Sequence, residues 1–256
     1  MQKKSSILFF ILGAFFVANA LLAEFIGVKI FSLEKTFGLT PVNLSLFGFD
    51  NLSFNLTAGV LLWPVVFIMT DIINEYFGRR GVRIMSFTAA GLIAYAFLMI
   101  FLSIGLTPSD FWIERTTHSG ILNMDLAFNT IFGQGLWIIF GSLVAFLIGQ
   151  LVDVTVFHYL RSFTGNSKIW LRATGSTLVS QFIDSFVVLF IAFYIGAGWE
   201  LSLVLAIGVV NYIYKFIVAV LLTPALYVLH YLIDKFLGKE ISEQLIKEAA
   251  ESSRLS

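Results

Sequence analysis

The stretch GSTLVSQFIDSFVVLFIAFYIGAG, residues 175–198, is the clearest indication of the fold class of this chain. It is apolar over the length that an α-helix needs to cross a bilayer, which is about 20 residues. A single charged side chain, Asp184, stands inside it. A charge in hydrocarbon is costly and usually marks a functional site. The stretch therefore predicts a membrane-spanning helix that carries a polar function.

The polar residues of this stretch share one side of the predicted helix. Thr177, Ser180, Gln181 and Asp184 follow one another at i, i+3, i+4 and i+7, which places them on one stripe. A polar stripe on an apolar helix faces the bundle interior or a water-filled cavity. The alternative is helix–helix contact through Ser, Thr and Gln side chains, which explains Asp184 poorly. We therefore expect Thr177, Gln181 and Asp184 in a binding site.

The next apolar stretch, residues 201–234, carries Asn211 and Lys215 on one face. Lys215 and Asp184 each lie near the middle of their helices, and a short loop makes these helices antiparallel neighbours. We expect the two charges to pair, because pairing removes two isolated charges from hydrocarbon. Asn211 and Lys215 join the candidate site. The alternative is a structural ion pair that binds no ligand.

The composition of the whole chain is also that of a membrane protein. Of the 256 residues, 58% are hydrophobic and 12% are charged, whereas soluble domains have about 45–50% and about 25%. A soluble globule of this size could not bury so much apolar surface, which argues against soluble, disordered and nucleic-acid-binding classes. The chain contains no cysteine, which excludes disulfides and thiolate metal sites.

Six stretches are long and apolar enough to span a membrane. They cover approximately residues 7–31, 55–76, 83–106, 128–157, 175–198 and 201–234. We therefore predict an all-α integral membrane protein with six transmembrane helices. The prediction divides the chain into a transmembrane domain, residues 1–238, and a short cytoplasmic amphipathic tail, residues 239–256.

The basic residues orient these helices, because cytoplasmic segments are enriched in Lys and Arg. With the N-terminus inside, twelve basic residues are cytoplasmic: Lys3, Lys4, Arg79, Arg80, Arg83, Arg161, Lys168, Arg172, Lys235, Lys239, Lys247 and Arg254. Two, Lys35 and Arg115, are external, and Lys29 and Lys215 lie within helices. We therefore expect both termini in the cytoplasm and a multi-pass protein of the cytoplasmic membrane.

The N-terminal end admits a second interpretation. Lys3, Lys4, an apolar run and the triplet Ala18-Asn19-Ala20 resemble a signal peptide with its cleavage site. The apolar run continues as far as Val28, which favours an uncleaved first helix.

The second predicted helix carries Asp71 and, one turn later, Glu75. Asp71 lies in its cytoplasmic third and is a candidate site residue. Glu75 is equally a site residue or a solvated boundary group that pairs with Arg79 or Arg80. Pro64 in the same helix frees a carbonyl that can bind a ligand or bend the helix.

Two other helices add candidates. Gln150 and Asp153 lie near the end of the fourth helix, and we expect Asp153 at the depth of Asp71, in a polar vestibule. On the first helix Asn19 lies nearer the midplane than Glu24 and is the better candidate.

Enzymatic and metal-binding functions find no support in the sequence. It has no His-Glu-x-x-His, Gly-x-Ser-x-Gly or Walker motif, and its three His residues are scattered. We therefore expect no catalytic residue, no metal and no cofactor. A channel usually needs symmetric polar rings from several subunits; scattered single charges favour a solute-binding cavity.

Four motifs together resemble the queuosine precursor transporter family. They are Trp63–Gly78 followed by Arg79, Arg80 and Arg83; Gly149–Phe157; Ser176-Thr177 with Asp184-Ser185 and Phe190–Phe193; and Asn211–Lys215 with Pro224. They fall in order across about two thirds of the chain. The first helix and both outer loops resemble the family only loosely.

The resemblance implies a six-helix importer of 7-deazaguanines, such as 7-cyano-7-deazaguanine and 7-aminomethyl-7-deazaguanine, for queuosine modification of tRNA. Its partners are then the small-molecule substrate and the lipid bilayer, with no direct contact to nucleic acid. A homo-oligomer is compatible with this interpretation. The six-helix plan is also similar to substrate-binding subunits of energy-coupling-factor vitamin importers. That alternative adds an ATPase module as a partner.

A deazaguanine fits the chemistry of the candidate residues. A carboxylate accepts the ring N–H and the exocyclic amine together, and the ring carbonyl accepts from Asn, Gln or Lys. Asp184 is the first choice for this edge, with Gln181, Asn211 and Lys215 beside it. Asp71 and Asp153 are gate or vestibule groups, either of which could relay a proton.

Overall fold

The fold is an elongated bundle of long helices, seen in a computed structural model that describes residues 2–118, 120–133, 136–165 and 168–252. Within these residues, five helices are long and apolar enough to cross a membrane. They are α1 (Gln2–Ile26), α3 (Trp63–Ile104), α6 (Leu136–Thr164), α7 (Ile169–Leu189) and α8 (Leu201–Leu237). The prediction of a helical membrane protein is confirmed. Arg254, counted above as cytoplasmic, lies outside the described residues.

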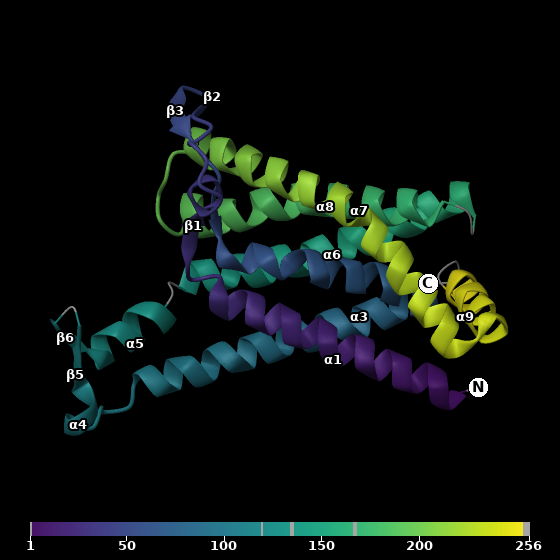
Figure 1. The fold of residues 1–256 in the computed structure, drawn as a ribbon, viewed down its shortest axis with the longest axis horizontal. Coiled ribbons are helices and arrows are strands. Elements are labelled where there is room, and N and C mark those ends of the chain that lie inside the picture. The colour runs from purple at the N-terminus through teal and green to yellow at the C-terminus, as the bar shows by residue number, and fades with distance from the viewer. Residues whose placement is uncertain (1, 119, 134–135, 166–167, 253–256) are drawn as a thin grey trace.

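Helix α3 consists of two limbs that meet at Gly78. There φ is 66° and ψ is −170°, a backbone conformation that is essentially restricted to glycine. The chain reverses its direction at this point, so that the second limb runs back along the bundle (Figure 1). The limbs correspond to the predicted helices 55–76 and 83–106.

The predicted start of the first limb at residue 55 was wrong. Residues Asn55–Thr57 form strand β4, and Ala58–Leu61 form the 3-10 helix η1. Helix α3 begins only at Trp63 and has Pro64 in its first turn. A proline costs no hydrogen bond there, because the first amides of a helix lack intrahelical partners. Pro64 therefore starts a helix instead of bending one.

Two hairpin segments cover the end of the bundle away from the termini (Figure 1), which we call the hairpin end. In the first, β1 (Ile30–Ser32) pairs with β4, and β2 (Leu44–Leu46) pairs with β3 (Phe49–Leu52), all antiparallel. Helix α2 (Leu33–Thr36) follows β1. The second contains α4 (Asp110–Ile113), the antiparallel pair β5 (Glu114–Thr117) and β6 (Gly120–Asn123), and α5 (Met124–Phe132).

The first hairpin segment is anchored by Glu34. Its carboxylate accepts a 2.9 Å hydrogen bond from the backbone N–H of Phe54 and another from the hydroxyl of Ser32. Desolvation opposes the ionised form, but these hydrogen bonds outweigh it and lower the pKa of Glu34. Lys29 also belongs to this segment, because α1 ends at Ile26. Its predicted place within a helix was wrong.

The opposite end of the bundle, which we call the terminal end, carries both described chain ends (Figure 1). Helix α7 continues into a π-helix, Phe190–Ile195, and α8 contains Pro224. Helix α9 (Lys239–Ser252) follows α8 and packs against α3.

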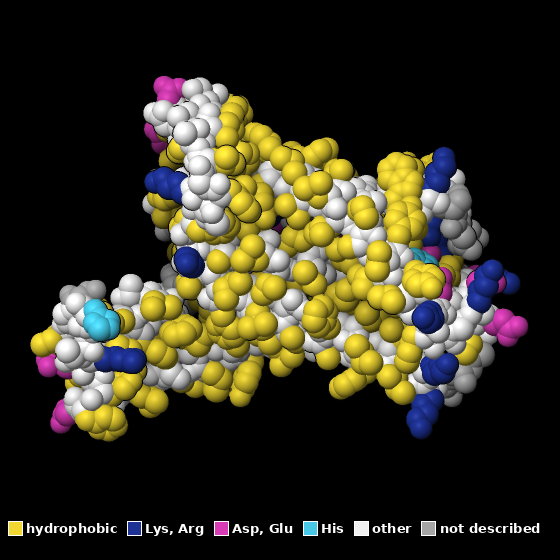
Figure 2. Space-filling model, in the orientation of Figure 1, with side chains coloured by type: hydrophobic (Ala, Val, Ile, Leu, Met, Phe, Trp, Pro, Cys, Tyr) yellow, Lys and Arg dark blue, Asp and Glu magenta, His cyan; other side chains and the backbone are white. Residues whose placement is uncertain are grey.

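Apolar side chains form both the core and the lateral surface. Phe16 of α1, Ile72 and Ile93 of α3 and Phe157 of α6 are at most 1% exposed and belong to one core cluster. Figure 2 shows hydrophobic side chains over the flanks of the bundle, with Lys and Arg gathered at the terminal end. An apolar flank of this kind suits a protein surrounded by lipid.

Candidate functional site

A cavity of about 450 Å³, which we call the large cavity, opens among α1, α6, α7 and α8 at the hairpin end. Five residues of the first hairpin segment also line it: Asn51, Leu52, Ser53, Asn55 and Thr57. Its polar lining residues are Glu24, Asn51, Ser53, Asn55, Thr57, Ser142, Asp184, Ser185, Asn211 and Lys215. The volume falls within the range of about 300–1,000 Å³ that is usual for small-molecule sites.

The charged pair of the large cavity joins α7 to α8. Lys215 Nζ donates to Asp184 Oδ2 at 2.5 Å, as the sequence predicted. The two side chains are 18% and 20% exposed. The pair is therefore electrically neutral and still reachable by a ligand. The second carboxylate oxygen of Asp184 remains available as an acceptor.

A second carboxylate lies on the α1 side of the large cavity. The hydroxyl of Ser142 on α6 donates to Glu24 on α1. Asn211 lies one turn before Lys215 on α8 and lines the same cavity. The cavity therefore offers carboxylates, amides and an ammonium group, which is a mixed set of donors and acceptors.

Aromatic rings complete the large cavity. Trp63, Phe193 and Trp199 line it, and the rings of Phe193 and Trp199 have centroids 4.5 Å apart. Flat aromatic faces beside polar groups suit a planar ligand with hydrogen-bonding edges.

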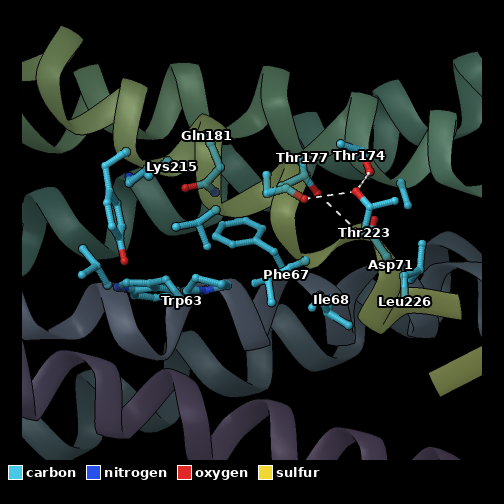
Figure 3. Close-up of a pocket in the computed structure, with 17 residues that line it drawn as sticks. Trp63, Phe67, Ile68, Asp71, Thr174, Thr177, Gln181, Lys215, Thr223 and Leu226 are labelled. Carbon is cyan, nitrogen blue, oxygen red and sulfur yellow. Dashed lines mark hydrogen bonds between the residues drawn. The ribbon is translucent and has the colours of Figure 1, made fainter. Parts of the chain in front are cut away.

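A second hollow, which we call the small pocket, lies between α3, α7 and α8 (Figure 3) and holds about 50 Å³. Thr177 Oγ1 donates to Asp71 Oδ2 at 3.4 Å, and Thr174 and Thr223 form a 2.9 Å hydrogen bond. Gln181 points into the same pocket. Val60, Trp63 and Lys215 line both hollows, so the small pocket adjoins the large cavity.

Further polar side chains lie buried behind the small pocket. Ser180 of α7 donates to Asp153 of α6 at 3.1 Å. Gln150 accepts a 3.1 Å hydrogen bond from Thr70. These contacts tie α6 to α3 and α7.

Glu75 takes a different partner from the predicted ones. The guanidinium of Arg172 donates to both of its oxygens, at 2.6 and 3.1 Å, and the carboxylate is fully buried. Arg161 adds a contact of 3.7 Å. The expectation of a solvated pair with Arg79 or Arg80 was wrong, because Arg172 enters the bundle and presents a bidentate fork.

The structure thus separates the predicted site residues by the hollow that each one lines. Asp184 and Asn211 line the large cavity, Asp71, Thr177 and Gln181 line the small pocket, and Lys215 lines both. Asp153, Gln150, Glu75 and Asn19 line neither. Asn19 instead donates to the carbonyl of Phe15 in its own helix at 2.8 Å.

Sequence reasoning missed several lining residues. Ser142, Asn51, Ser53 and Asn55 carried no signal, because long-range packing brings them to the cavity. Glu24 did carry one, as an ionisable group in an apolar helix, but its distance from the midplane ranked it below Asn19.

The chain matches a family model described as "Putative vitamin uptake transporter" over residues 57–229. It is 32% identical over 181 residues to a "Probable queuosine precursor transporter" of Bacillus subtilis, covering 68% of this chain and 72% of the relative. It is 29% identical over 198 residues to a protein of that name from Haemophilus influenzae, covering 75% and 74%.

A third relative is the "Queuosine precursor transporter" of Escherichia coli, which is 27% identical over 185 residues, covering 69% of this chain and 73% of the relative. No solved structure matches the chain. The family model covers more than half of the chain and includes α3, α6, α7 and most of α8. The chain therefore belongs to the "Putative vitamin uptake transporter" family and is a multi-pass transporter of the cell membrane, not an enzyme.

Proposed function

We propose that this protein imports a queuosine precursor and binds it in the large cavity. The substrate class is a 7-deazaguanine base, such as 7-cyano-7-deazaguanine or 7-aminomethyl-7-deazaguanine, or a related nucleoside, taken up for tRNA modification. The names of three relatives support the substrate class. The composition of the large cavity supports the binding place.

The observation that carries the proposal is the Lys215–Asp184 pair beside aromatic rings. A carboxylate can accept the ring N–H and the exocyclic amine of a guanine-like edge together. The ring carbonyl then accepts from Lys215 or Asn211, and the flat face lies against Trp63, Phe193 or Trp199. Stacking of a base on an aromatic ring contributes about 1–3 kcal/mol in nucleic-acid-binding proteins.

The large cavity and the small pocket differ in volume. The small pocket holds about 50 Å³, and one water molecule occupies about 30 Å³ in the liquid. The volume of the small pocket lies far below the range of about 300–1,000 Å³ that is usual for small-molecule sites. The large cavity, with about 450 Å³, has room for a base and some accompanying water.

The topology belongs to the same proposal. We take each limb of α3 as a separate membrane span, which gives six spans with both termini in the cytoplasm. The gathering of Lys and Arg at the terminal end supports this orientation (Figure 2). The large cavity then opens toward the outside, and the small pocket lies deeper toward the cytoplasm.

Rescue of a host that cannot synthesise queuosine tests the proposal. Cells that express the full chain should gain queuosine in their tRNA at low external precursor. An inserted protein that gives no gain with precursor bases, queuine or queuosine would refute the import proposal. Uptake by liposomes that contain this chain alone would count against the alternative of a binding subunit that needs an ATPase module.

A further inference from the structure

Two buried carboxylates of the bundle, Asp71 and Asp153, lie outside the large cavity. Asp71 on α3 is 5% exposed, and Asp153 on α6 is 0% exposed. Among the residues that the structure describes, no Lys, Arg or His forms an ion pair with either of them. An unpaired charge buried within a membrane-spanning bundle is costly, so buried carboxylates are usually paired with a cation or protonated.

Helix α7 connects the two carboxylates through hydroxyl groups. Thr177 donates to Asp71, and Ser180, one turn later on the same helix, donates to Asp153. The single hydroxyl proton of Ser180 can instead go to the carbonyl of Thr177, which lies 3.1 Å away. Each acid therefore has one hydroxyl partner on α7, and the two partners lie one turn apart on that helix.

Several buried polar atoms in this region have no hydrogen-bond partner among the described residues. They include Asp71 Oδ1, Asp153 Oδ2 and the amide nitrogens of Gln150 and Gln181. The Gln181 side chain is 4% exposed and points into the small pocket beside Asp71. Buried polar groups are normally satisfied, so these atoms indicate a small bound species.

The surrounding charges do not neutralise the two acids. On α3, Glu75 lies one turn from Asp71, and Glu75 forms ion pairs with Arg172 of α7 and Arg161 of α6. On α8, Lys215 forms an ion pair with Asp184 of α7. His158 of α6 forms its hydrogen bond with Asn74. Each nearby cation is therefore engaged elsewhere.

We propose that Asp71 and Asp153 form a proton-binding site that couples import to the proton gradient. This inference rests on the proposed import function, for which the proton gradient would be the energy source. One proton binds the pair from the hairpin end and is released toward the terminal end as the base crosses. A bound divalent metal is disfavoured, because the described residues contain no cluster of three or more metal-ligating His, Cys, Asp or Glu.

The small pocket supplies the route to this site. It reaches Asp71 and shares Val60, Trp63 and Lys215 with the large cavity. Its volume of about 50 Å³ is enough to hold water, which needs a cavity of about 10–15 Å³. Water there can satisfy Gln181 and carry a proton to Asp71, while Asp153 on α6 is held by the hydroxyl of Ser180 on α7.

Liposomes that contain the purified full chain and a trapped pH dye test the coupling. On addition of 7-cyano-7-deazaguanine outside, we expect the lumen to acidify and an inward proton gradient to raise accumulation at least tenfold. Asp71→Asn and Asp153→Asn should each abolish both effects and keep exchange of internal for external base. Glu243→Gln, an exposed change on α9, should behave as wild type. Import without acidification, or import driven by a sodium gradient, would overturn the proton site.

Infrared spectroscopy of the substrate-free protein tests the site independently of transport. We expect the carbonyl band of a protonated carboxylic acid at neutral pH, reduced in Asp71→Asn and in Asp153→Asn. An unchanged band in both variants would overturn the inference. A band that depends on these residues in a protein that takes up no base would instead leave the site standing and remove the import proposal.

Discussion

Lys215 on α8 and Asp184 on α7 form a 2.5 Å ion pair on the wall of the large cavity. The pair joins two consecutive helices and leaves one oxygen of Asp184 without this contact. It can therefore hold the helices together when the cavity is empty and present an acceptor when a ligand arrives.

Asp184→Asn should weaken uptake of 7-cyano-7-deazaguanine. The amide has one acceptor atom where the carboxylate has two, and hydrogen bonds to charged groups contribute about 1.5–3 kcal/mol. The expected loss is about ten- to hundredfold in initial uptake at low base concentration, with normal membrane insertion. Unchanged uptake would remove Asp184 from the site.

The ion pair should also show a coupling energy in protein stability. Lys215→Met leaves Asp184 uncompensated, and we expect a loss of about 1–3 kcal/mol, less than for a fully buried pair because both side chains are about one fifth exposed. The double variant Asp184→Asn, Lys215→Met should regain most of this loss. Thermal unfolding in detergent measures it. Strictly additive losses would contradict the pairing.

Glu75→Gln should destabilise the fold much more strongly. It breaks the bidentate pair with Arg172, whose side chain is 1% exposed, and it leaves a buried cation without its partner. Removal of one member of a buried pair costs about 3–5 kcal/mol. Arg80→Gln changes an exposed residue and serves as the control. Equal melting temperatures for the two variants would contradict the assignment of the pair.

Gly78→Ala should destabilise the reversal in α3. A side chain in this backbone conformation, φ 66° and ψ −170°, costs about 1–3 kcal/mol. Gly91 is the matched control, because it lies in the second limb and has open space where a Cβ would stand. Gly91→Ala should be neutral or slightly stabilising. Thermal unfolding of the two variants measures the difference in stability. A Gly78→Ala protein as stable as Gly91→Ala would argue against the reversal at Gly78.

The absence of cysteine makes the proposed topology directly testable. Single cysteines at Asp50 and Ser109 should react with an impermeant maleimide added to intact cells. A single cysteine at Arg80, next to the reversal, should react only after the membrane is opened. Labelling of the Arg80 position from outside would contradict two spans within α3.

The sequence predicted those features of the fold and site that depend on local pattern. Hydropathy alone locates the long helices, and the spacing of Thr177, Gln181 and Asp184 shows which side of α7 is polar. Lys215 could be assigned to Asp184 because their helices follow one another along the chain and therefore pack together.

Features that depend on distant parts of the chain could not be predicted in this way. Glu75 has Arg79 and Arg80 close by in sequence, yet it pairs with Arg172, which lies 97 residues away. Glu24 meets Ser142 over 118 residues. The start of α3 was displaced because the pairing of β4 with β1 removes residues 55–57 from the helix.

Uptake of labelled 7-cyano-7-deazaguanine by liposomes that contain only this chain shows whether the protein imports the base by itself. We expect saturable uptake that 7-aminomethyl-7-deazaguanine competes for and that Asp184→Asn reduces by about ten- to hundredfold. Uptake by the wild type no greater than in protein-free liposomes, with the chain correctly folded and inserted, would contradict it.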